Sequence, residues 1–519
     1  MIKITPNSQN TYYRMPVFNC IAVGRAYELL REDLLKHLRF VQKELKFKYC
    51  RFHALFHDDM SVVIRKPDGS IGYQWHHIDK IYDSLLDMGL RPFVELNPMP
   101  KALASGEQTA FWWKMNVTPP KTYEMWADLV EAFARHLTER YGIEEIRQWY
   151  FEVWNEPNLD FFWSGSKEDY WKLYDAAAFA LKKVDKGLRV GGPASAGAVW
   201  ITDIIEHCSQ NNVPIDFVTT HVYPQGEYCD YPDRKGSPHE IGEYLADMVK
   251  RVYEEVKSSS MPHLMIHWTE WNTMSADSSD SVDWVNNKYV DNIFAASYIA
   301  KNCLKFDGLT DSMTYWTASD IFEETSLGHS PFSCTYGLVT IHGIPKASFN
   351  AMKMLRRLNG NIMNITSSSD FPAGCGISAV ENAEKVKGLV WNHHMLEIKD
   401  QPVWNEKIRI SVTKDTDYRV VMSTIKEGAG SAWETWCQMG KPHNLTPMEE
   451  ELLWAHSQPE YSFKICTPEN GEIELEIVLK PNEVMYFEAM AVGEPIMPKP
   501  AACEEIDAWA EGMDLNLKE

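Results

Sequence analysis

The stretch FEVWNEPNLDFFW, residues 151–163, joins an apolar strand directly to an acidic turn. Its first residues carry the aromatic and β-branched side chains that are typical of a buried strand. Pro157 cannot donate to a strand ladder, so the strand stops there and leaves Glu156 at its carboxyl end. Asn-Glu-Pro is also a good turn sequence, but a turn does not require an apolar strand to run straight into the acid. We therefore interpret Glu156 as a functional carboxylate at a strand end.

Strand-like and helix-like segments alternate on both sides of this stretch, from about residue 17 to 345. Leu30, Leu34, Leu38, Val41 and Leu45, for example, recur at helical spacing after the first strand. The eight expected strands are residues 17–23, 48–55, 91–97, 146–157, 188–193, 216–224, 263–272 and 311–317. Eight β/α units over this length predict an α/β fold, a (β/α)8 TIM barrel spanning residues 13–345.

A doubly wound sheet is the alternative architecture for the same alternation. That fold would lead us to expect a Gly-rich phosphate loop after an early strand. The sequence VGRAYE, residues 23–28, has a single glycine. The barrel is therefore the preferred interpretation.

The pattern changes after about residue 346, where short strands are separated by turn residues and most have no helical spacing between them. This pattern predicts an antiparallel β-sandwich accessory domain over residues 346–490. Residues 346–358 are expected to form the helix that joins it to the barrel, and residues 1–12 could add a strand to it. Residues 491–519 are expected to be a C-terminal extension.

Composition limits the kinds of partner. With 73 acidic and 51 basic residues the formal net charge is -22, which repels nucleic acid phosphates and anionic lipid. Aromatic residues make up 12%, which fits stacking on sugar faces, although filling the core is the commoner role of any single ring.

None of the ten cysteines forms a CxxC pair, so a zinc ribbon or a thioredoxin-type site is not expected. The start MIKITPNSQN lacks the apolar run of a signal peptide, which predicts a cytoplasmic protein unless a signal peptide has been removed.

A second strand end resembles the first. In LMIHWTEWN, residues 264–272, an apolar strand runs into Glu270, although a salt-bridged structural carboxylate would look the same. Glu156 and Glu270 end the fourth and seventh expected strands, whose ends can face each other across a barrel mouth. Two facing carboxylates are what glycosidic cleavage needs, one to protonate the leaving oxygen and one to attack the sugar or activate water. The charge of one raises the pKa of the other, while their separation is not fixed by sequence.

The chain resembles glycoside hydrolase family 39, which includes β-xylosidases and α-L-iduronidases. The resemblance covers the barrel and continues into the sandwich. It is carried by VGRAYELLR (23–31), YCRFHALFHDDM (49–60), FEVWNEPNLDFFW (151–163), HVYP (221–224), HWTEWN (267–272), YWTASDIFEE (315–324) and PFSCTYGLVTIHGIPK (331–346). It implies retention through a covalent glycosyl-enzyme, with Glu156 as the general acid/base and Glu270 as the nucleophile.

The resemblance also implies roles for residues around the pair. Asn155 would bond the sugar 2-hydroxyl, His53 would contact the 3-hydroxyl, and Trp316 would form the floor of the pocket. His221 and Tyr223 would be the strand-six pair, with the tyrosine near the nucleophile, and Glu323 and Glu324 would hold distal hydroxyls. The alternative interpretation of His53 is a structural histidine. The alternative interpretation of Glu323 and Glu324 is a solvated acidic pair. No cofactor and no metal is expected, and the group His57, Asp58 and Asp59 is interpreted as a hydrogen-bonded rim loop.

The acidic segment DIFEE, residues 320–324, disfavours a sugar that carries a carboxylate. We therefore expect a retaining exo-glycosidase that removes terminal β-linked xylose from oligosaccharides. One alternative is another specificity: α-L-arabinosidase, β-glucosidase, β-galactosidase or α-L-iduronidase. The other is an inactive carbohydrate-binding protein, which the presence of both glutamates disfavours. The expected partner is an oligosaccharide or glycoside, with no nucleic acid and no membrane; a homo-oligomer is compatible with the sequence but indicated by no pattern.

Overall fold

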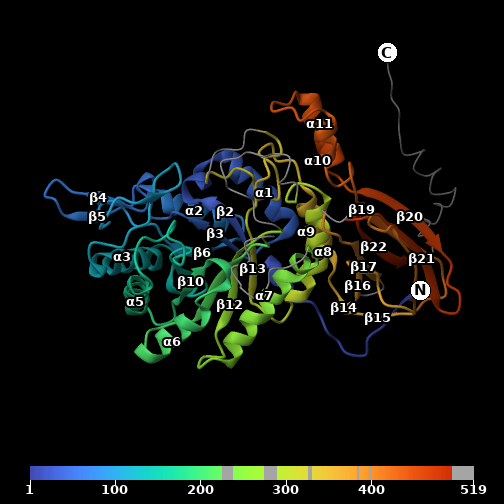
Figure 1. The fold of residues 1–519 in the computed structure, drawn as a ribbon, viewed down its shortest axis with the longest axis horizontal. Coiled ribbons are helices and arrows are strands. Elements are labelled where there is room, and N and C mark those ends of the chain that lie inside the picture. The colour runs from blue at the N-terminus through green and yellow to red at the C-terminus, as the bar shows by residue number, and fades with distance from the viewer. Residues whose placement is uncertain (225–237, 274–288, 325–329, 383–384, 397–399, 494–519) are drawn as a thin grey trace, which may run out of the picture.

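The computed structural model describes residues 1–224, 238–273, 289–324, 330–382, 385–396 and 400–493. A closed barrel of eight parallel strands occupies the blue-to-green part of the chain (Figure 1), which confirms the predicted fold. In chain order its strands are β2 (Cys20–Arg25), β3 (Tyr49–His53), β6 (Arg91–Leu96), β9 (Tyr150–Val153), β10 (Arg189–Ser195), β11 (Phe217–Val222), β12 (Met265–Trp271) and β13 (Ser312–Tyr315). Strand β13 pairs with β2 and closes the ring.

Helices cover the outside of the barrel; α1 and α2, for example, bury one face, whereas nearly every residue of α8 is buried. The main ones are α1 (Glu32–Leu45), α2 (His76–Asp87), α3 (Tyr123–Tyr141), α5 (Lys167–Val184), α6 (Ile201–Asn211), α7 (Pro238–Ser258) and α8 (Ile293–Asn302). Helix α5 begins where Ser166 and Asp169 form a capping box. The helical spacing begins at Leu30, but α1 begins at Glu32, because Arg31 is extended and separates α1 from a 3₁₀ turn, η2 (Ala26–Leu30).

Aromatic side chains close the amino end of the barrel. Phe93, Tyr150 and Phe217 pack there with Cys20, and the rings of Phe93 and Tyr150 stack at 4.9 Å between centroids. The barrel interior is therefore a packed core at this end, as in other barrels of this type. A ligand can enter only at the carboxyl ends of the strands, where both glutamates lie.

Two sheets form the second body, which is built mostly from the orange-to-red part of the chain and includes β1 from the blue N-terminal end (Figure 1). One has the order β15-β1-β18-β21 and the other β14-β16-β17-β22-β19-β20. Apolar side chains such as Ile408, Leu475 and Phe487 form the core between them. The strands are β1 (Ile2–Thr5), β14 (Asn361–Ile362), β15 (Asn364–Ser367), β16 (Cys375–Asn382), β17 (Lys385–Asn392), β18 (Trp404–Ser411), β19 (Tyr418–Ile425), β20 (Glu460–Cys466), β21 (Glu472–Leu479) and β22 (Val484–Ala491).

The sandwich differs from the expectation in three details. Strand β1 runs parallel to β18, so the domain is not purely antiparallel. Strands β14, β15 and β16 and the helices α10 (Trp433–Gln438) and α11 (Pro447–His456) were not predicted. Helix α11 was missed because Leu453 is its one buried residue, so it lacks the apolar stripe that marks a helix in a sequence. Helix α9 (Ala347–Arg357) joins the two bodies as predicted.

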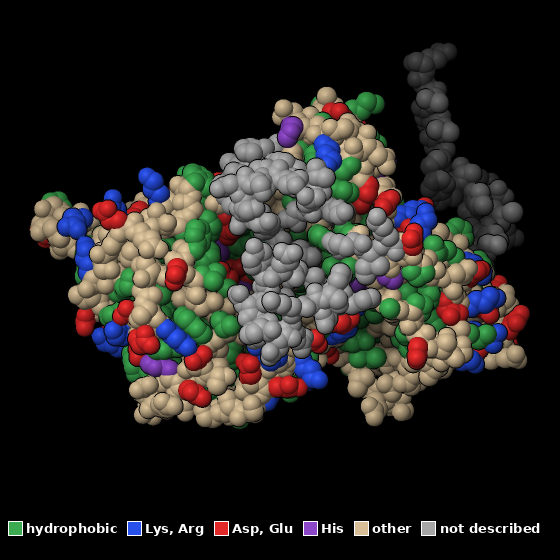
Figure 2. Space-filling model, viewed as in Figure 1, with side chains coloured by type: hydrophobic (Ala, Val, Ile, Leu, Met, Phe, Trp, Pro, Cys, Tyr) green, Lys and Arg blue, Asp and Glu red, His purple; other side chains and the backbone are tan. Residues whose placement is uncertain are grey.

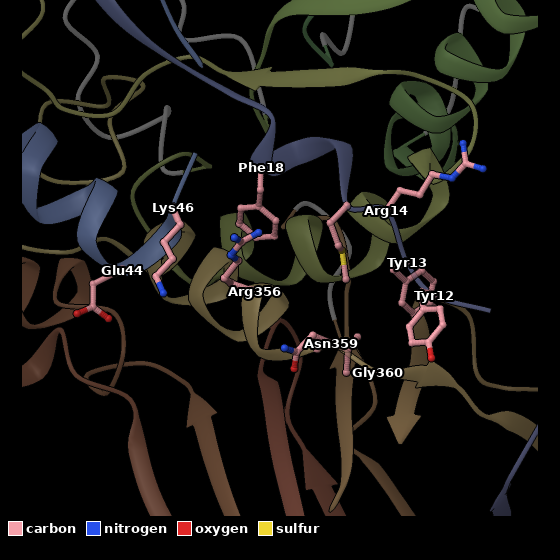
Figure 3. A pocket seen from close by; sticks show the side chains of 11 residues that line it. Tyr12, Tyr13, Arg14, Phe18, Glu44, Lys46, Arg356, Asn359 and Gly360 are labelled. Atoms are coloured by element: carbon pink, nitrogen blue, oxygen red, sulfur yellow. The ribbon is translucent and has the colours of Figure 1, made fainter. Parts of the chain in front are cut away.

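A groove of about 460 Å³ lies at the amino end of the barrel, beside the connection to the sandwich (Figure 3). Phe18 and Lys46 come from the barrel side and Arg356 and Asn359 from the end of α9 and the residues after it. Because this groove lies at the end opposite the two glutamates, it is not the candidate active site.

Acidic and basic side chains are interspersed on the described part of the face in Figure 2. Within the described ranges, no helix combines the length and the apolar character needed to cross a membrane.

Candidate active site

Glu156 follows strand β9 in a strained turn. Its φ is 44°, in the left-handed region that side chains rarely adopt, and Trp154 has a φ of 70°. Each such residue costs about 1–3 kcal/mol unless its surroundings hold it in place. The Glu156 N–H donates to the carbonyl of Ala194 on the neighbouring strand at 2.8 Å. The turn therefore fixes the direction of a side chain that is itself only 12% exposed.

Glu270 lies near the end of strand β12, where the strand register shifts. Thr220 pairs with Trp268 and His221 pairs with Glu270, so Thr269 is the extra residue of a β-bulge. Bulges re-aim side chains and are common next to active sites. Oxygen atoms of Glu156 and Glu270 and a nitrogen of His221 all lie within 4.8 Å of one another. The fold thus brings together two carboxylates that are 114 positions apart in the sequence.

Hydrogen-bond donors surround Glu270. Arg51 Nη1 donates to its Oε1 at 2.9 Å, and the Tyr223 hydroxyl donates to its Oε2 at 2.8 Å. Burial raises the pKa of Glu270, while Arg51, His53 and the Tyr223 hydroxyl act to lower it. These contacts stabilise the charged form that a nucleophile requires.

Glu156 has a different environment. Its Oε1 lies 2.8 Å from Nδ1 of His221, an imidazole that is fully buried. Burial, reinforced by the charge of Glu270, raises the pKa of Glu156 well above its ordinary value. Burial lowers the pKa of His221 well below its ordinary value, so this ring is neutral. Both pKa values are raised, that of Glu156 more strongly, so Glu156 keeps its proton more readily than Glu270, which suits acid and nucleophile roles.

The sequence did not single out Arg51, which organises the centre of the site. Its Nε donates to Glu152 at 2.6 Å, and its Nη2 donates to Asn155 at 2.9 Å and contacts Glu95 at 2.7 Å. Arg51, Glu95 and Glu152 were detectable as charges inside apolar strands, since a buried charge needs a partner. Arg51 also lies two positions before His53, on the same face of strand β3.

We expect Arg51→Met to lower the free energy of unfolding by about 3–5 kcal/mol, because it leaves buried carboxylates without their counterion. Urea unfolding measures this change. Arg135→Met is the matched control, since Arg135 pairs with Glu131 on an exposed helix face and should change stability by less than about 1 kcal/mol. Equal stability of the two variants would show that Arg51 is not a required counterion of the buried carboxylates around it.

The remaining expected residues divide into two groups. The His53 and Trp316 rings lie 4.6 Å apart between centroids, and His53 Nε2 is 3.4 Å from Glu270 Oε1 and 3.8 Å from Glu324 Oε1. His53, Trp316 and Glu324 therefore line the same space as the pair. Burial, together with the charges of Glu270 and Glu156, raises the pKa of Glu324 well above its ordinary value.

Glu323 has different partners from this group, and its expected role toward a distal hydroxyl stays a prediction. Arg25 Nη2 contacts its Oε2 at 2.7 Å, and Arg31 Nη1 contacts its Oε1 at 3.1 Å. Both oxygens are therefore used in ion pairs at the rim. Arg25 also contacts Asp59, so this part of the rim loop is tied to the barrel by charge.

Glu156, His221 and Glu270 have the ligand types and spacing that could hold a metal ion. The same atoms already have protein partners, because Glu270 accepts from Arg51 and Tyr223 while Glu156 contacts His221. A nearby guanidinium also opposes a bound cation. The donor set therefore fits a hydrogen-bonded pair of carboxyl groups better than a metal centre.

A closed (β/α)8 barrel with two glutamates of unequal environment at its mouth defines the class of barrel glycosidases. The family model of Glycosyl hydrolases family 39 matches residues 1–474. The chain belongs to glycoside hydrolase family 39, as its motifs indicated, and is a glycosidase.

Several relatives are similar over nearly their whole length. A β-xylosidase from Caldicellulosiruptor saccharolyticus is 38% identical over 494 residues, which cover 93% of this chain and 98% of that protein. A β-xylosidase from Geobacillus stearothermophilus is 36% identical, covering 90% and 91%. The solved structure of a monomeric β-xylosidase from Caulobacter crescentus CB15 superposes with a TM-score of 0.83 at 33% identity, covering 95% of this chain and 100% of that chain.

Proposed function

We propose that the chain is a retaining, exo-acting β-xylosidase in which Glu270 is the nucleophile and Glu156 the acid/base. The observation that carries this proposal is that one oxygen of Glu156 and one oxygen of Glu270 lie within 4.8 Å of each other. Retaining enzymes hold the pair about 5–5.5 Å apart, whereas inverting enzymes need about 6.5–9.5 Å to admit a water molecule. An approach of this size lies on the retaining side of these two ranges and supports retention.

In the first step Glu270 attacks the anomeric carbon as the bond from that carbon to the leaving oxygen breaks. Glu156 gives its proton to the leaving oxygen, so the aglycone departs as a neutral alcohol. In the second step Glu156, now a carboxylate, takes a proton from water, and the water oxygen displaces Glu270 from the sugar. Two inversions at one carbon give net retention.

The surroundings of the pair fit a sugar with neutral hydroxyl groups. Asn155, His53 and Glu324 offer polar atoms, and the Trp316 ring forms an apolar wall beside them. The arginines at the rim, Arg25 and Arg31, are paired with Glu323. Among the residues that the structure describes, a carboxylate on the sugar would therefore meet acidic groups before a free cation, which disfavours an iduronide. The names of the similar relatives support xylose.

A panel of 4-nitrophenyl glycosides tests this specificity. We expect β-D-xyloside to have the highest kcat/KM, at least about tenfold above β-D-glucoside, because the pocket must exclude or bury the extra hydroxymethyl group. Proton NMR of the first product should show the β-anomer before mutarotation. Preference for the α-L-iduronide would contradict the sugar assignment, and a first-formed α-anomer would contradict retention.

A further inference from the structure

A chain of hydrogen bonds leads away from Glu156 into the barrel. Glu156 Oε1 is 2.8 Å from His221 Nδ1, and the Nε2 atom of the same ring is 3.1 Å from Thr269 Oγ1. The Thr269 hydroxyl then donates to Glu152 Oε1 at 2.7 Å. Glu152 ends the chain, because its Oε2 accepts from Arg51 Nε at 2.6 Å. All five residues of this chain are buried, at 0–9% exposure.

The direction of each hydrogen bond follows from Glu152, the ion-paired carboxylate at the end of the chain of hydrogen bonds. Glu152 is ion-paired with Arg51 and can only accept, so the single proton of the Thr269 hydroxyl must point to it. Thr269 Oγ1 then has only lone pairs for His221, so Nε2 of the imidazole carries the proton. A neutral imidazole protonated on Nε2 presents a lone pair at Nδ1. The 2.8 Å contact to Glu156 therefore needs the carboxyl proton of Glu156.

We propose that Thr269 and Glu152 are positioning residues for catalysis, which hold His221 in the tautomer that accepts a proton from Glu156. This inference rests on the proposed role of Glu156 as the acid/base. It assigns a function to the bulge in β12, because the extra residue lets both Thr269 and Glu270 face the interior. Glu152, four positions before Glu156, therefore belongs to the same chain of hydrogen bonds.

The arrangement serves both steps of the reaction. Before cleavage, the lone pair at Nδ1 favours the protonated form of Glu156, which is the form that can donate to the leaving oxygen. After donation, the same lone pair faces the new carboxylate and disfavours its charge. Glu156 is then a stronger base for the proton of the incoming water, and the proton it takes restores the starting state.

Other charged and titratable groups also face Glu156 and His221. They are Arg51 and His53 from β3, Glu95 from β6, Glu270 from β12, Tyr223 after β11 and Glu324 after β13. All of them remain when the Thr269 hydroxyl alone is removed. A change caused by that removal therefore reports on the tautomer of His221.

Thr269→Val tests the proposal because it keeps the side-chain shape and removes the hydroxyl. Without an acceptor for Nε2–H, the imidazole shifts to the tautomer protonated on Nδ1, which donates to the Glu156 carboxylate and stabilises its charge. We expect the basic limb of the kcat/KM pH profile to move down by about one pH unit. Hydrolysis of 4-methoxyphenyl glycosides should fall about tenfold or more, while 2,4-dinitrophenyl glycosides should be little affected, because only poor leaving groups need the proton.

Thr269→Ser is the matched control, since it keeps the hydroxyl and should restore both the pH limb and the leaving-group dependence. A folded Thr269→Val protein with a wild-type pH limb would overturn the proposal. Neutron diffraction of the unaltered protein gives an independent answer: deuterium on Nε2 of His221 supports the tautomer, and deuterium on Nδ1 alone overturns it. Failure of the proposed function is separate, because it would appear as undiminished activity in Glu270→Gly or Glu156→Ala whatever the tautomer.

Discussion

The Glu270→Gly variant loses turnover of its best aryl glycoside by at least about 10⁴-fold, the size of effect seen when a covalent nucleophile is removed. The physical reason is that no other described carboxylate lies beside Glu156 with both Arg51 and Tyr223 donating to it. Steady-state release of the phenolate measures the loss.

Azide should restore turnover in Glu270→Gly. Deletion of the side chain leaves a space lined by the Arg51 guanidinium and the Tyr223 hydroxyl, and these two donors suit a small anion. The azide attacks from the face that Glu270 occupied, so the product is the glycosyl azide of inverted configuration. Product NMR identifies the anomer.

Glu144→Gln is a suitable control for handling and folding, because Glu144 lies on α4 (Ile143–Ile146) with an 82% exposed side chain. It should retain full activity. If Glu270→Gly kept most of the wild-type rate, the nucleophile would have to be another residue.

The Glu156→Ala variant gives the second large effect, and the effect depends on the leaving group. Substrates with poor leaving groups should lose about 10²–10⁴-fold in kcat/KM, because the departing oxygen receives no proton. The 2,4-dinitrophenyl glycoside should keep a fast first step, since its phenolate leaves without help. Water is then not activated, so the glycosyl-enzyme accumulates and a burst of phenolate precedes a slow steady state.

Azide distinguishes this variant from the previous one. In Glu156→Ala it attacks the glycosyl-enzyme without base assistance, so turnover rises and the glycosyl azide has retained configuration. A stopped-flow trace measures the burst, and product NMR gives the anomer. Equal losses for good and poor leaving groups, without a burst, would contradict the acid/base role of Glu156.

Much of the candidate active site was predictable, because the sequence features that indicate it lie within short segments. An apolar run that stops at Pro157 places Glu156 at a strand end, and the repeat of eight such runs predicts the barrel. The motifs then placed His53, Tyr223 and Trp316 near the pair, and the structure brings all three into the same space. Where the pattern is not periodic, as in α11, the prediction failed.

The pairing of charges was not predictable from local signals. Arg51 and Glu152 are 101 positions apart and Arg31 and Glu323 are 292 apart, so nothing in either neighbourhood specifies the partner. The ion pairs of Glu323 with Arg25 and Arg31 were therefore not predicted. The β-bulge at Thr269 was equally unpredictable from the sequence, because it is a property of the register between β11 and β12.

The sequence by itself therefore determined the barrel, the family and the two glutamates, because strand periodicity, strand-ending residues and motifs are written within short segments. Only the tertiary structure decided how close the carboxyl groups lie, which carboxylates surround Arg51, and how Thr269 directs His221. Those features depend on the closure of the ring and on strand register. Both are set by packing between distant segments and not by the residues of any one of them.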